Sequence, residues 1–128
     1  ALASYFMPAN TMGATGSLHI IAAGTTTGAT DTKTIRLDFG ATTLATVALA
    51  SGASTDWAFD AWISNTATGA QRVIVRFFEG TATLEGVDYI TAAIDTTASV
   101  TIRVSGQLGG ASDTITQTMF SVFLFHTA

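Results

Sequence analysis

Alternation between apolar and polar residues is the main pattern in this chain. It is strict between Lys33 and Gly40, where Ile35, Leu37 and Phe39 are separated by single polar residues. A period of two places one row of side chains in a core and the other row in solvent. The segment therefore predicts a half-buried β-strand, ended by glycine, in a sheet with one solvent-facing side.

The same alternation recurs along the chain, and helical periodicity is hard to find. We expect residues 25–32, 51–55 and 65–70 to be loops or turns. The predicted strands cover residues 3–7, 17–23, 33–39, 42–48, 56–63, 71–79, 99–105 and 114–126, with a weaker run over 81–91.

About eight such strands, at this spacing, predict an all-β fold: an antiparallel β-sandwich of jelly-roll type, formed by residues 1–128 as a single domain. An immunoglobulin-type sandwich is the second choice, because its Cys, Trp, Cys signature is missing. Residues 1–10 are expected to form an extended N-terminal arm or an edge strand, since Pro8 cannot donate a ladder hydrogen bond.

The last predicted strand is apolar on both sides. Phe120, Val122 and Leu124 lie on one side, and Met119, Phe123 and Phe125 lie on the other. Either this strand is central and covered by a loop, or its second side packs against another subunit. The chain has no predicted helix that could cover a sheet, so we favour the subunit contact and take Met119, Phe123 and Phe125 as candidate interface residues.

Trp62 is the aromatic residue whose predicted outward face could serve as a carbohydrate-stacking platform. Residues 56–63 alternate so that Trp57, Phe59 and Ile63 face the core while Trp62 faces outward. An outward indole can act as a stacking platform for carbohydrate, although burial at a sheet edge or a subunit contact is the commoner role of such a residue.

Composition narrows the choice of partners. Charged residues make up 11% of the chain, against about 25% in ordinary soluble domains, and the net charge is -4. Five scattered lysines and arginines do not form the cluster that nucleic acid requires. No apolar run reaches the length of a membrane span, no signal peptide is evident, and the absence of cysteine excludes disulfides. A surface of threonine, serine and glycine suits a subunit of an assembly.

No catalytic constellation is evident, so we predict that the protein is not an enzyme and needs no cofactor. His19 and His126 are the only histidines, and without cysteine they cannot complete a usual zinc site. Asp56 and Asp60 are expected to be surface acids, and a calcium site using Asp31 lacks the usual loop motif. The four arginines, Arg36, Arg72, Arg76 and Arg103, are expected to pair across strands with Asp38, Asp56 or Asp60.

Three segments together resemble a group of virion proteins of tailed bacteriophages: F-M-P-A-N-T-M-G at 6–13, K-T-I-R-L-D-F-G at 33–40 and V-T-I-R-V-S-G-Q at 100–107. The resemblance implies a small jelly-roll-like sandwich, usually trimeric, that is a non-enzymatic module of the virion. Such modules occur as capsid decoration (cement) or head-fibre proteins and as tips of tail fibres and spikes. No catalytic residue is implied.

Two functions follow as expectations. The first is a trimeric decoration protein on the virion surface whose partner is the major capsid protein. The second is a receptor-binding tip that recognises a host cell-surface glycan, with Trp62 as a candidate contact. A fibre tip would need a shaft or attachment domain, and none precedes the first strand, so a chain that truly starts at Ala1 favours the decoration protein.

Overall fold

The computed structural model describes residues 1–28, 31–49, 55–80 and 84–125, and within these ranges the regular structure consists of strands only. The nine strands are β1 (Ala3–Met7), β2 (Ser17–Thr27), β3 (Lys33–Phe39), β4 (Thr42–Leu49), β5 (Thr55–Ala67), β6 (Ala70–Glu79), β7 (Leu84–Ala92), β8 (Val100–Gln107) and β9 (Thr114–Phe125).

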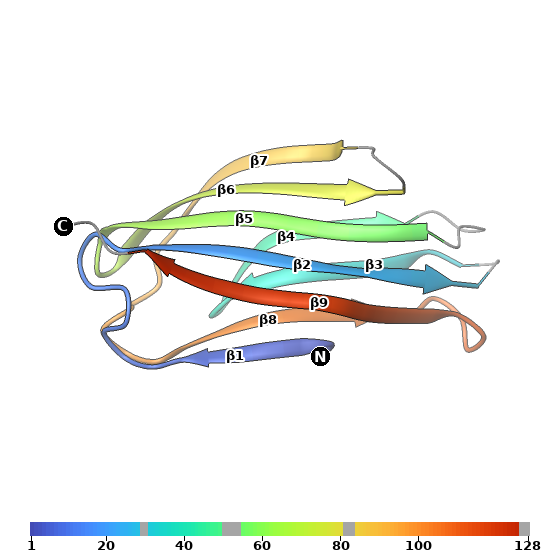
Figure 1. The fold of residues 1–128 in the computed structure, drawn as a ribbon, viewed down its shortest axis with the longest axis horizontal. Coiled ribbons are helices and arrows are strands. Elements are labelled where there is room, and N and C mark those ends of the chain that lie inside the picture. Colours follow the sequence, from blue (N-terminus) through green and yellow to red (C-terminus); the bar gives the residue numbers. More distant parts are fainter. Residues whose placement is uncertain (29–30, 50–54, 81–83, 126–128) are drawn as a thin grey trace.

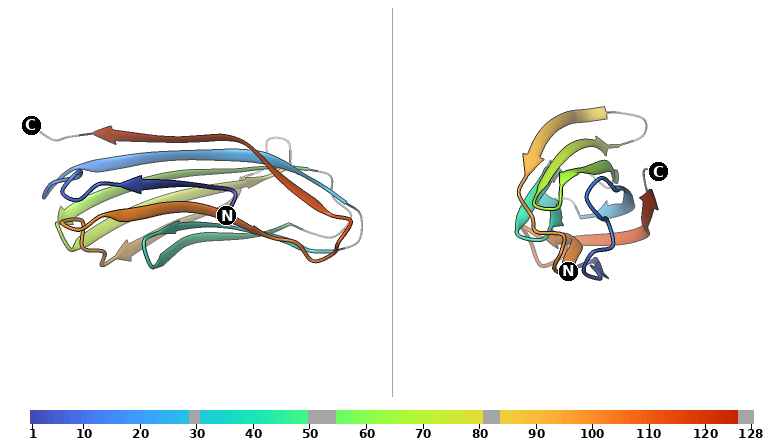
Figure 2. Two further views of the ribbon diagram at one scale, coloured as in Figure 1. Left: turned by 90° about the horizontal axis from the view of Figure 1, so that it is seen from below. Right: turned by 90° about the vertical axis from the view of Figure 1, so that its left-hand side faces the viewer.

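The strands form two antiparallel sheets that pack face to face along the long axis of the molecule (Figures 1 and 2). One sheet has four strands in the order β1-β8-β3-β4, and the other has five in the order β7-β6-β5-β2-β9. The chain passes between the two sheets after β1, β2, β4, β7 and β8, so many neighbouring strands are not consecutive in sequence. The predicted antiparallel β-sandwich is confirmed, with nine strands in place of about eight.

The core lies between the sheets and is formed by the inward row of each strand. In β3 this row is Ile35, Leu37 and Phe39, all fully buried. In β5 it includes Trp57, Phe59 and Ile63, as the alternation predicts. The core is therefore built by period-two patterning, because a strand that covers another sheet must turn every second residue toward it.

Several predicted boundaries were wrong, although β1 and β3 match their predictions at both ends. β2 continues to Thr27 because Thr25 and Thr26 pair with both β5 and β9 and Thr27 pairs with β9, so the predicted loop at 25–32 begins too early. The turn expected at 65–70 contains only Thr68 and Gly69. Residues 106–107 were expected to follow the eighth strand, but they belong to β8. Of the loop expected at 51–55, residues 51–54 lie outside the described residues, as do 81–83 of the weak run at 81–91.

Residues 1–10 include an edge strand, one of the two forms expected for them. β1 pairs on one side with β8, where Ala3 faces Val104 and Met7 faces Val100. Its five residues cover only part of β8, which continues to Gln107.

A hydrogen-bonded network closes the sandwich at the start of β2. The Asn65 side-chain amide donates to the Gly13 carbonyl and to Thr96 Oγ1, both at 2.8 Å. The Gln71 amide donates to Asn65 Oδ1 at 2.9 Å and also to the Ile94 carbonyl. Buried amides are costly unless they are paired, and here they join the N-terminal turn, the β5–β6 hairpin and the β7–β8 connection.

A buried ion pair closes the opposite end, after β2. Lys33 lies on the same side of β3 as the core residues, and its ammonium donates to the carbonyls of Gly28 (3.1 Å) and Asp31 (3.3 Å). The Lys33 Nζ atom is 3.9 Å from Asp113 Oδ2, and both side chains are fully buried. Gly28 is required beside this pair, because a Cβ atom at position 28 would lie 2.0 Å from Asp113 Oδ1. The pair thus joins the loop after β2 to the residue that precedes β9.

We expect Lys33→Met to lower the free energy of unfolding by about 3 kcal/mol, because it leaves the Asp113 carboxylate buried without its cation. Chemical denaturation of the purified protein measures this change. The double variant Lys33→Met/Asp113→Asn should recover part of the loss, since it removes the uncompensated charge. Arg36→Met, at an exposed position of the same strand, should change stability by less than about 0.5 kcal/mol. Equal losses for the two single variants would contradict this account.

Candidate functional site

The outer faces of the two sheets differ sharply in character. Seven of the eleven exposed large apolar side chains project from the outer face of the five-stranded sheet: Trp62, Ile74, Val87, Tyr89, Met119, Phe123 and Phe125. We call this surface the aromatic face. On the four-stranded sheet, Phe6 is the one exposed large apolar side chain that the described outer face carries, beside threonines and the Arg103–Asp38 pair. Free subunits rarely expose such a concentration of apolar side chains without an interaction partner.

One row of side chains crosses the aromatic face from edge to edge. The register of the strands places one residue of each strand opposite the next across the sheet: Tyr89 of β7, Ile74 of β6, Trp62 of β5, His19 of β2 and Phe123 of β9. Directly opposite residues in antiparallel strands are in contact range of each other. The row is thus one continuous strip and not a set of isolated residues.

His19 and Trp62 stack in the middle of this row. Their ring centroids are 3.9 Å apart and the rings are inclined by 8°. His19 Nε2–H donates a hydrogen bond to Asp60 Oδ1, and Arg76 Nη1 lies 3.5 Å from Asp60 Oδ2. The carboxylate therefore links an imidazole and a guanidinium across β2, β5 and β6.

All four predicted site residues lie on the aromatic face. Met119, Phe123 and Phe125 are each about half exposed, at 50%, 48% and 47%. Trp62 is 38% exposed, and the Phe125 ring lies beside it with centroids 5.5 Å apart. The structure brings Trp62, Phe123 and Phe125 together through His19, since Phe123 is also 6.1 Å from the imidazole. One side of the Trp62 indole is covered by that imidazole.

β9 is an edge strand without the usual protection against pairing. Its twelve residues include no charged residue and no proline, which are the common devices that keep a sheet edge from pairing with another chain. The other edge strand of the same sheet, β7, contains the charged residue Asp88. The register shift opposite Ala23 and Gly24 lies in the first half of β9. The regular second half carries Phe123 and Phe125.

A groove opens between β9 and β1, which are edge strands of the two sheets. Its volume is about 400 Å³, and its lining is largely apolar: Ser4, Tyr5, Met7, Thr11, Leu18, Phe120, Val122 and Leu124. These include core-facing side chains of the two edge strands. The groove and the aromatic face thus adjoin on the two sides of β9.

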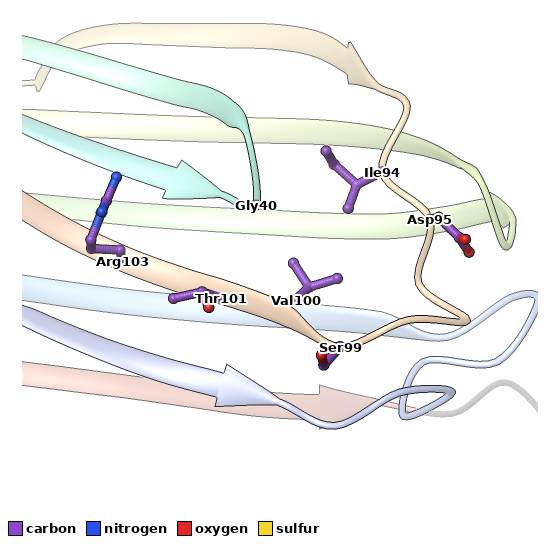
Figure 3. A pocket seen from close by; sticks show the side chains of 7 residues that line it. All are labelled: Gly40, Ile94, Asp95, Ser99, Val100, Thr101 and Arg103. Carbon is purple, nitrogen blue, oxygen red and sulfur yellow. The ribbon is translucent and has the colours of Figure 1, made fainter.

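A second hollow, of about 360 Å³, lies beside the β3–β4 turn (Figure 3). Ile94 and Val100 point into it, whereas the Asp95 carboxylate points away from them. Thr97 bonds that carboxylate through its hydroxyl (2.5 Å) and its backbone N–H (3.0 Å). These two hydrogen bonds, the hydroxyl first, lower the pKa of Asp95. The Asp95 carboxylate thus accepts hydrogen bonds from its own turn and does not face the hollow.

The other candidate groups are placed as follows. The predicted cross-strand pairs are found for Arg103 with Asp38 and for Arg76 with Asp60. The prediction was wrong for Arg72, whose guanidinium lies 5.8 Å above the Tyr89 ring centroid, and neither Arg36 nor Asp56 is in an ion pair within the described ranges. His126 lies outside them.

The described residues contain no group of three or more His, Asp or Glu side chains, Asp31 among them, that could hold a metal ion. They also contain no helix of the length and apolar character that a bilayer crossing requires.

Sequence reasoning missed the extent of the aromatic face. Val87 and Tyr89 alternate with Asp88 and Ile90, so period-two reading of the seventh strand could have placed them outward. His19 has outward parity in β2, but its position between Trp62 and Phe123 depends on the register of three strands. No local pattern in the sequence fixes that register.

Comparison with protein-family models, with curated proteins and with solved structures finds no match for this chain.

We expect Thr97→Val to raise the pKa of Asp95 toward its ordinary value, because the variant removes the hydroxyl that favours the ionised carboxylate. The backbone hydrogen bond remains, so the pKa should stay somewhat below that value. An NMR titration of the Asp95 side chain measures both proteins, and Thr101→Val, on the rim of the same hollow, is the control. An unchanged pKa in Thr97→Val would contradict this assignment.

Proposed function

We propose that this protein is a non-enzymatic structural subunit that assembles through its aromatic face, and that it serves as a trimeric decoration protein on the capsid of a tailed bacteriophage. The observation that carries the assembly is the contrast between the aromatic face and the polar face of the other sheet. Two sheets can cover only each other's inner sides, so the aromatic face needs a partner from outside the subunit.

The energy of such a contact indicates that the whole face takes part. Covering the exposed half of one large apolar side chain contributes about 1 kcal/mol. A micromolar complex needs a net gain of about 8 kcal/mol after the losses of association. Contact through Phe123 alone is too weak, so the side chains of the whole aromatic face and those of the surface that it meets must both contribute. The uncharged edge of β9 supports the same proposal, because it adds no charged side chain to the repulsion between copies that each have a net charge of -4.

The phage assignment and the trimer rest on the resemblance of three segments to virion proteins. These segments include β1's end, β3 and β8, which are neighbours in the four-stranded sheet. A decoration protein that binds only the assembled shell stabilises that shell by mass action. The partner in this proposal is the major capsid protein, and the protein is located in the virion.

A receptor-binding tip that recognises a host glycan is the second candidate. Its support is the position of Trp62 on an exposed face beside Asp60 and Arg76. A sugar ring stacks on the flat side of an indole, and His19 already covers one side of Trp62. The geometry therefore favours assembly over glycan binding.

We expect the wild-type protein to have a mass near 40 kDa in light scattering at micromolar concentration, three times the chain mass of 13.2 kDa. Phe123→Asp should yield a folded monomer, because a carboxylate cannot be buried at the contact without a partner. Phe6→Asp is the matched control: it makes the same substitution at a 65% exposed residue of the other sheet and should leave the trimer intact. A wild-type protein that is monomeric at this concentration would refute the assembly.

The capsid location predicts that the protein separates with heads when virions are disrupted. Mass spectrometry of purified heads and purified tails from the same particles measures this directly. The expected result is the protein in heads in many copies and its absence from tails. Recovery from tails alone would favour the receptor-binding tip, and absence from both fractions would refute a virion function.

A further inference from the structure

His19 is the titratable residue at the centre of the aromatic face. It lies between Trp62 and Phe123 in the row that crosses the sheet, and its side chain is 18% exposed. Histidine is the side chain whose charge ordinarily changes between pH 5 and pH 8. A contact that covers this face therefore also covers a group that can gain a charge in that range.

The charged residues near His19 lie on the side of β5 and β6, and none lies on the side of β9. From β5, Asp60 accepts its hydrogen bond, while Asp56 pairs with Thr25, six residues further along β2. Behind Asp60, β6 contributes Arg76, which bonds the other carboxylate oxygen. From β9, the facing residues are Phe123 and its neighbours, and that strand has no charged residue. With neutral His19 the group of Asp60 and Arg76 has no net charge, and with protonated His19 it has a net charge of +1.

From this geometry we propose that protonation of His19 weakens assembly through the aromatic face, so that the subunits associate at neutral pH and separate at acid pH. This inference rests on the proposed assembly. Covering the face removes the water that would solvate an excess charge. The neutral pair of Asp60 and Arg76 loses less solvation free energy on burial than the same pair beside a protonated His19.

The sign of the pH dependence follows from proton binding. The assembled form disfavours the imidazolium, so it binds fewer protons than the free subunits. Association therefore weakens as the pH falls through the range in which histidine titrates. The net charge of the chain has the opposite effect on association. As the pH falls toward the isoelectric point near 4.7, the net charge of -4 decreases in magnitude and the repulsion between copies becomes weaker. Weaker association in acid is thus specific to a titrating group in the contact.

The experiment is sedimentation velocity of the wild-type protein at about pH 8 and about pH 5.5, at equal ionic strength, across a dilution series. We expect the dissociation constant to rise by about tenfold per histidine at the lower pH, the change that a one-unit difference in proton affinity produces. His19→Gln keeps an amide donor for Asp60 and cannot titrate, so it should assemble equally at both pH values. His126→Gln, the control at the other histidine, should keep the wild-type pH dependence.

A second variant covers the case in which glutamine disturbs the fold. His19→Phe keeps an aromatic ring against Trp62 and leaves Asp60 paired with Arg76, and it too should lose the pH dependence. Wild-type association that is equal or stronger at pH 5.5 would refute this inference and leave the assembly standing. So would unchanged pH dependence in both His19 variants. A wild-type protein that is monomeric at both pH values would instead refute the assembly itself.

Discussion

The fold depends on the fact that a strand has two sides and a two-layer sandwich covers only one of them. Each sheet turns its inward row toward the other, and the buried residues of both rows form one core. The four-stranded sheet meets this constraint in the common way, with threonines and the Arg103–Asp38 pair on its outer side. The five-stranded sheet does not, because aromatic and aliphatic residues occupy its outer side as well. The exposed aromatic face, with His19 at its centre, follows from these additional apolar residues.

Much of the fold could be predicted from the sequence because alternation is a local property. The bounds of β3 and the inward row of β5 follow from period two alone. Where glycine and threonine suggested a loop, as at Thr25–Thr27, the strand continued, since pairing with neighbouring strands outweighs weak local preference. The burial of Lys33 was missed, although it shares parity with Ile35; a lysine is rarely buried, and its partner Asp113 is eighty residues away.

The candidate site was predictable only in part, for the same physical reason. Met119, Phe123, Phe125 and Trp62 could each be assigned to an outer side from their own strands. Their convergence on His19 depends on how β9, β2 and β5 are aligned, and alignment is set by packing across the whole sheet. The sequence excludes a usual zinc site at His19 but does not reveal its hydrogen bond to Asp60. The aromatic rings of Trp62 and Phe123 beside it place His19 at the centre of the aromatic face.

Folding uses one side of β9, and the proposed assembly would use the other. Phe120 and Val122 pack against the core, so substitutions there affect the stability of the subunit itself. Phe123, one residue further, belongs to the aromatic face and is absent from the core cluster. The core and the polar contacts at both ends of β2 are formed within one chain. The subunit could therefore lose the proposed contact through the aromatic face without losing its fold, which is the condition for the proposed response of the assembly to protonation of His19.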